Sequence, residues 1–223
     1  MFDAQPPAAL TLSHARIVTP AGVTEGALRI EDGRIAGFGA ATDGLDLHGA
    51  YLIPGIVDLH TDHVERHTHP RVSVLWPFLP ALMAHDAVVI SGGTTTVFDS
   101  LSVGASMKRP ERREILEPLV AALAEGQAAG AFRAEHLLHL RCEISDPATM
   151  ALVDATASHP LTRLVSVMDH TPGDRQSPDV DKWFTHMIHE MEVDEATGRA
   201  MMDDLFERSR ARGAEVRAHV IRA

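Results

Sequence analysis

The sequence has a single cysteine, Cys142, and few basic residues: 20 Lys and Arg stand against 31 Asp and Glu in 223 residues. One cysteine excludes an internal disulfide framework and a multi-cysteine zinc site, and it fits the reducing cytoplasm, where we expect the protein. The acid excess, a formal net charge of −11, argues against a nucleic-acid partner, because phosphate backbones require a basic surface. No apolar run approaches the roughly 18 residues of a membrane-spanning helix, and the N-terminus lacks a signal-peptide pattern. We therefore expect no membrane partner either.

Several nucleotide-binding and catalytic motifs are also missing. There is no phosphate-binding G-x-x-x-x-G-K-[ST] loop, and Gly37-Phe38-Gly39 does not continue into a dinucleotide fingerprint. No H-E-x-x-H or G-x-S-x-G sequence occurs, which argues against zincin proteases and serine hydrolases. Cys142 lies inside an apolar run, so we predict a buried small hydrophobic residue rather than a nucleophile.

The chain divides into two segments with different patterns of predicted secondary structure. Residues 1–54 read as short strands with a hairpin signal at Asp32-Gly33, which predicts a small β-sandwich segment without helices. Residues 55–223 alternate strands and helices, which predicts an α/β fold with a parallel sheet. The strands are expected near 56–60, 94–101, 136–144, 162–170 and 214–221, and the helices at 76–90, 110–130, 147–157 and 180–212. The acidic stretch 179–207 favours a solvated helix face over a specific binding surface.

The stretch from Pro54 to His67 is rich in groups that bind metals. His60 and Asp62 are two residues apart at the end of a predicted strand, so their side chains point the same way. Imidazole and carboxylate ligands suit Zn, Mn, Fe or Ni, and sites in parallel α/β folds lie at the carboxyl ends of strands. The alternative is a hydrogen-bonded core histidine beside a carboxylate that caps a turn. The density of histidine and acidic residues favours a metal site.

Further polar residues follow the other predicted strands. Asp99, Glu143 and the pair Asp169-His170 each stand where a strand is expected to end. Glu143 could bridge two metals and His170 could complete a coordination shell. Alternatively, Asp99 caps a helix and Glu143 forms an ion pair with Arg141.

The sequence YLIPGIVDLHTDHVERHTHPR, with GTTTVFDSL, HLRCEIS and MDHTPGDRQ, resembles the PhnM family of the amidohydrolase superfamily. The first barrel strand of that superfamily normally ends in His-x-His, whereas here it ends in His60-Thr61-Asp62. The resemblance implies a metal-dependent hydrolase-type (β/α) barrel. It also implies hydrolysis of α-D-ribose 1-methylphosphonate 5-triphosphate to the 5-phosphate and pyrophosphate, within phosphonate breakdown by the carbon–phosphorus lyase pathway. The alternatives are an amidohydrolase that cleaves a C–N bond and an inactive fragment.

The resemblance also suggests roles for residues. It implies one or two divalent transition-metal ions, with candidate ligands His60, Asp62, His63, His67 and Glu143. The candidate catalytic residues are Asp62, Glu143 and His170, and Glu65 belongs to the same motif. A triphosphate needs cationic partners, for which the candidates are Arg66, Arg71, Arg141 and Arg175.

The length of the chain raises a further expectation. An eight-stranded barrel takes about 250 residues, and we predict only four to five βα units here, the last strand offering only His219. We therefore expect an incomplete barrel that is inactive alone and associates, as a homo-oligomer or otherwise, through exposed barrel edges.

Overall fold

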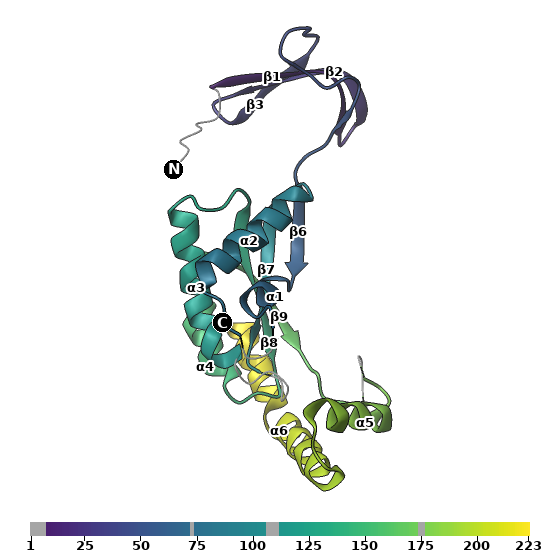
Figure 1. Cartoon of the computed structure of the whole chain (residues 1–223), viewed down its shortest axis with the longest axis vertical. Helices are drawn as coiled ribbons and strands as arrows, with labels where there is room; N and C mark the ends of the chain where they lie inside the picture. The colour runs from purple at the N-terminus through teal and green to yellow at the C-terminus, as the bar shows by residue number, and fades with distance from the viewer. Residues whose placement is uncertain (1–7, 72–73, 106–111, 174–176) are drawn as a thin grey trace. The chain divides into compact units, whose positions relative to one another are not determined.

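The computed structural model describes residues 8–71, 74–105, 112–173 and 177–223 (Figure 1). The chain separates into two compact units, Met1–Gly55 and Ile56–Ala223. No helix in the described part of the chain combines the length and apolar character needed to cross a membrane.

The first unit is a β-sheet without helices in its described residues. Its strands are β1 (Ala9–Thr19), β2 (Gly22–Glu31), β3 (Arg34–Gly39), β4 (Leu45–Asp46) and β5 (Tyr51–Leu52). The hairpin predicted at Asp32-Gly33 joins β2 to β3, and both turn residues have positive φ, 48° and 73°. This backbone suits the tight turn that Asp-Gly pairs favour. Ala15, Ile17 and Leu28 form a small core for the sheet.

The second unit confirms the predicted α/β fold. Its described residues contain a parallel sheet in the order β6-β7-β8-β9, half the strand number of a complete eight-stranded barrel. The strands are β6 (Ile56–Thr61), β7 (Thr94–Val103), β8 (Glu135–Glu143) and β9 (Thr162–Met168). The helices are α1 (Val64–Thr68), α2 (Phe78–Ser91), α3 (Arg112–Ala128), α4 (Thr149–Thr156), α5 (Val180–Met191) and α6 (Glu195–Arg222).

The main core lies between this sheet and its helices. Figure 1 shows α2, α3 and α4 together on one side of the sheet, with α5 beyond the carboxyl ends of the strands and α6 running from there back alongside α4. Leu101, Leu138 and Leu140 of the strands pack with Leu116 and Leu123 of α3 in one buried cluster. Side chains of alternate strand residues therefore enter this core, and the residues between them point to the other face.

Two predictions about the last hundred residues are wrong. The expected helix at 180–212 is divided into α5 and α6, because Glu192 adopts a left-handed conformation (φ 53°) and Asp194 caps a new helix. The expected strand at 214–221 is the end of α6. Val216 and Val220 are four residues apart and buried, so this apolar spacing serves a helix packed against α4.

A pair of leucine substitutions would test the location of the core. Leu138 is fully buried in β8, whereas Leu59 in β6 is 58% exposed. We expect Leu138→Ala to lower the free energy of unfolding by about 2–5 kcal/mol, because it leaves a cavity. Leu59→Ala should change it by no more than about 0.5 kcal/mol. Urea unfolding followed by circular dichroism measures both, and equal losses would contradict this core.

Candidate active site

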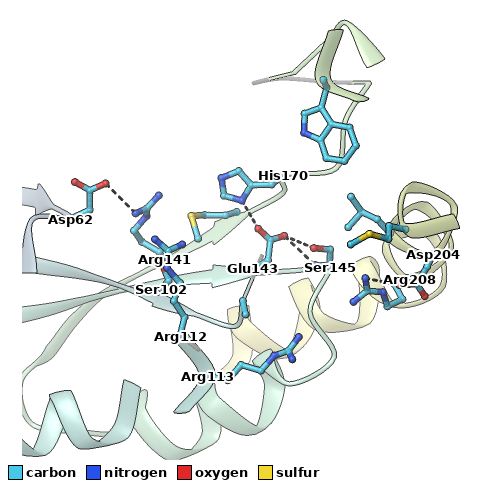
Figure 2. Close-up of a pocket in the computed structure, with 15 residues that line it drawn as sticks. Asp62, Ser102, Arg112, Arg113, Arg141, Glu143, Ser145, His170, Asp204 and Arg208 are labelled. Atoms are coloured by element: carbon cyan, nitrogen blue, oxygen red, sulfur yellow. Dashed lines mark hydrogen bonds and ion pairs between the residues drawn. The ribbon is translucent and has the colours of Figure 1, made fainter. Parts of the chain in front are cut away.

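A cavity of about 520 Å³ opens at the carboxyl ends of the parallel strands (Figure 2). This volume falls within the range of small-molecule sites. It is lined from β6 to β9 and from α3, α5 and α6 by Asp62, Ser102, Ala105, Arg112, Arg113, Arg141, Glu143, Ser145, Met168, His170, Trp183, Met201, Asp204, Leu205 and Arg208.

Glu143 and His170 form the central polar pair of the cavity. Glu143 ends β8 and is only 4% exposed, and its carboxylate is hydrogen-bonded to Nδ1 of His170 beyond β9. The other carboxylate oxygen accepts hydrogen bonds from the amide and hydroxyl of Ser145, at 3.2 and 2.9 Å. This arrangement fixes the carboxylate and places a titratable imidazole where a proton could be held or passed on. The alternative ion pair between Glu143 and Arg141 is not among the described contacts.

Arginines surround this pair, and each has an acidic partner. Arg113 of α3 binds Asp146 through two hydrogen bonds, of 2.7 and 2.9 Å. Arg141 lies 3.8 Å from Asp62, and Arg208 lies 2.7 Å from Asp204, between nitrogen and oxygen atoms. Arg112 pairs with Glu65 of α1. The site is therefore a cavity of guanidinium groups, an arrangement that suits phosphate oxygens.

The predicted phosphate-binding arginines do not all line the cavity. Arg141 lines the cavity, whereas Arg66 and Arg71 are exposed and are not among its lining residues. Arg175 lies outside the described residues. Sequence reasoning missed Arg112, Arg113 and Arg208, because helical arginines near an ion-pair partner carry no local signal for a cavity.

The predicted metal ligands lie in four places. Asp62 and Glu143 line the cavity, and His63 is exposed at the start of α1. His60 on β6 packs its ring against that of His139 on β8, with 5.0 Å between centroids. His67 lies beside His85 of α2, with 5.5 Å between ring centroids. The ligand set stays a prediction.

His139 is a neighbour of this site that sequence reasoning left without a role. Its ring nitrogens lie 3.1 Å from the Ser100 hydroxyl and 2.8 Å from the Ser166 hydroxyl. Burial, followed by the nearby His60, lowers the pKa of His139 below that of a free histidine. His139 is therefore a neutral, hydrogen-bonded imidazole on the same sheet face as Arg141.

Two other predicted strand-end residues are placed differently from expectation. Asp99 lies inside β7, which continues to Val103, and its carboxylate faces α2 rather than the cavity. His219 lies in α6 and contacts Asp154 at 2.7 Å. Both expectations were wrong, because a strand end was placed too early and a helix was taken for a strand.

These features define the class of protein. The parallel strand–helix units, with polar side chains at their carboxyl ends, are those of part of a (β/α) barrel fold. Sequence comparison then finds the similarity that the sequence motifs predicted. The chain is 35% identical over 178 residues to the α-D-ribose 1-methylphosphonate 5-triphosphate diphosphatase of Escherichia coli. The match covers 78% of this chain and 47% of that enzyme, so the chain corresponds to about half of its relative's length.

Other matches are shorter or more distant. The chain is 40% identical over 96 residues to an adenine deaminase of Kosmotoga olearia, which is 41% of this chain and 15% of that enzyme. A D-hydantoinase crystal structure superimposes with a TM-score of 0.49 at 18% identity, over 81% of this chain and 43% of that one. No family model matches the chain.

The thiol of Cys142 offers a test of the sheet behind the cavity. It is fully buried, and burial raises its pKa to about 12. At pH 8 the thiol is therefore protonated and shielded, and we expect no reaction of the folded chain with a colorimetric disulfide reagent. The unfolded chain should react with one equivalent. A Ser91→Cys variant, exposed at the end of α2, should react at once when folded. Rapid labelling of the wild-type chain would contradict the predicted burial.

Proposed function

We propose that the cavity binds the triphosphate of α-D-ribose 1-methylphosphonate 5-triphosphate and belongs to a site that releases pyrophosphate from it. One observation carries the proposal: Arg112, Arg113, Arg141 and Arg208 line the same cavity as the Glu143–His170 pair. Guanidinium groups stabilise the charge on phosphoryl oxygens, and their planar donors match two oxygens at once. The E. coli relative carries this activity in its name and supports the choice of substrate.

The reaction breaks one P–O bond and forms another. The oxygen of a water molecule attacks the α-phosphorus, and the bond to the oxygen that bridges to the β-phosphorus breaks. The products are α-D-ribose 1-methylphosphonate 5-phosphate and pyrophosphate. The Glu143–His170 pair accepts the proton of the attacking water, because its carboxylate is held by Ser145 and its imidazole can carry the charge. The arginines neutralise the leaving pyrophosphate.

Side chains at and next to the cavity are of the types that bind a divalent metal ion. Asp62 and Glu143 line the cavity, and His60 lies in β6, which ends one residue before Asp62. Imidazole and carboxylate groups suit such an ion. When bound, the ion would lower the pKa of a water molecule and neutralise phosphoryl charge. Among the described residues, however, these donors are not gathered within ligand distance of one another. We therefore assign the described residues the binding, orientation and proton transfer.

The competing function is hydrolysis of a C–N bond. Its support is the local similarity to an adenine deaminase and to a D-hydantoinase of Rhizobium radiobacter, the latter 34% identical over 94 residues. The arginine-rich lining favours the polyphosphate substrate, because a neutral cyclic amide has no use for this number of cations. Parallel assays with hydantoin and adenine separate the two functions.

The decisive measurement is binding, because it needs only the residues that line the cavity. Arg141 has the longest of the described ion-pair separations in the cavity, 3.8 Å, so its guanidinium is the one best able to turn to a ligand. We expect Arg141→Met to weaken the binding of the ribose triphosphate at least about tenfold, since a charged hydrogen bond contributes about 1.5–3 kcal/mol. Isothermal titration calorimetry on the purified chain measures the loss.

Arg163→Met is the matched control. Arg163 lies on neighbouring strand β9, is exposed, and is not a lining residue of the cavity. Its substitution should leave the affinity unchanged. Equal effects of the two variants, or no binding of the triphosphate by the wild-type chain, would refute the proposal. Turnover of hydantoin or adenine without binding of the triphosphate would favour the C–N function.

A further inference from the structure

A second cluster of metal-binding side chains lies on the opposite face of the sheet from the cavity. It consists of His85 on α2, Asp99 in β7 and His136 in β8, each no more than 1% exposed. His136 shares its side of β8 with the core residues Leu138 and Leu140, and Arg141 and Glu143 point the other way. The cluster is thus separate from the proposed substrate site.

In this cluster, one imidazole nitrogen faces each oxygen of the Asp99 carboxylate. One oxygen of Asp99 lies 2.8 Å from Nε2 of His85, and the other lies 2.7 Å from Nδ1 of His136. Of the groups in the described residues, this is the one whose donor atoms all lie within 4.8 Å of one another. Ligands of a tetrahedral zinc ion are separated by about 3.3 Å, so the two nitrogen–oxygen separations would widen by roughly half an ångström around an ion. The imidazole nitrogens of His85 and His136, which lie within 4.8 Å of each other, would adjust to the same spacing.

A second buried carboxylate supports a cation at this place. Asp86 follows His85 on α2, and its Oδ1 accepts the amides of Arg133 and Ala134 at 2.9 Å. The same oxygen lies 3.4 Å from Nε2 of His136. A histidine that binds a metal through one nitrogen commonly donates its other N–H to a carboxylate. Asp86 and His136 form that arrangement.

The two buried carboxylates of this region, Asp86 and Asp99, need a positive charge nearby. Asp86 and Asp99 are buried, and a buried carboxylate is costly unless it is paired. The Asp86 Oδ2 atom and the His85 Nδ1 atom are buried without a hydrogen-bond partner. Arg133 approaches Asp86 only to 3.7 Å and is largely exposed. A divalent ion would balance the charge of both carboxylates.

A further imidazole stands next to the cluster. The ring centroid of His67 on α1 is 5.5 Å from that of His85. His67, which the sequence suggested as a ligand of the strand-end metal, is therefore a neighbour of the cluster of His85, Asp99 and His136.

We propose that His85, Asp99 and His136 bind one zinc-class transition-metal ion, with Asp86 as the carboxylate behind His136. The ion joins α2 to β7 and β8 and stabilises the fold. The competing interpretation is that protons on the imidazoles supply the positive charge and no metal binds.

Cobalt binding by the purified chain tests the proposal, because Co²⁺ takes zinc sites and absorbs visible light. After removal of metals with a chelator, we expect one equivalent of Co²⁺ to give the intense spectrum of a tetrahedral site with nitrogen and oxygen ligands. Zinc should displace it and raise the melting temperature. Absence of both the spectrum and the stabilisation in the folded wild-type chain would overturn the proposal, whatever the variants do.

Substitutions locate the ion. Asp99→Asn and His136→Gln preserve side-chain size and should weaken cobalt binding at least about a hundredfold, with folding checked by circular dichroism. The matched control is the double variant His60→Gln/Asp62→Asn, which alters the strand-end donors. It should keep the full cobalt spectrum. Loss of the spectrum in that control, with retention in Asp99→Asn, would assign the ion to the strand end and refute the proposal. If neither single variant folds, the cobalt spectrum of His85→Gln is compared with that of the wild-type chain. An unchanged spectrum in His85→Gln would refute the proposal.

Discussion

The alternation of side chains along the parallel strand β8 is the constraint on which the rest of the second unit depends. His139, Arg141 and Glu143 point to one face, whereas His136 and Leu138 point to the other, because neighbouring strand residues alternate. The in-register pairing of β7 with β8 extends this division across the sheet, so that Asp99 lies beside Leu138. One strand therefore contributes to the arginine-lined cavity, to the apolar core and to the buried histidine cluster. A shift of one residue in register would exchange all of them.

The edge of the cavity is held by Asp146, which follows β8. Its carboxylate accepts the amide of Ala105 at 2.5 Å, the amide of Ala148 at 3.0 Å, and both hydrogen bonds of Arg113. Gly104, which precedes Ala105, has φ +89°, and an added Cβ would lie 2.3 Å from the Thr149 hydroxyl. Only glycine fits this approach. Arg113 is thus positioned by a buried carboxylate that joins the ends of β7 and β8 to α3.

Sequence patterns predicted the local structure better than the site. The apolar spacing in α2 and α3 and the Asp32-Gly33 hairpin signal depend on nearby residues, and these features were predicted correctly. The prediction of a strand at 214–221 was wrong because the spacing of Val216 and Val220 also suits a helix. Packing against α4 decides between strand and helix. The His136–Asp99 and Arg113–Asp146 pairs span 37 and 33 residues, respectively. Such contacts depend on the topology of the sheet, which no local spacing encodes.

The ion pairs in the cavity determine how an anion could enter it. Arg113 and Arg208 are held at 2.7 Å by Asp146 and Asp204, so a phosphate must share their guanidinium groups with these carboxylates. Arg141 and Asp62 are 3.8 Å apart and therefore interact weakly. In the proposed reaction, a phosphate that takes Arg141 leaves the Asp62 carboxylate without its cation. A divalent ion held by Asp62 would supply the missing positive charge.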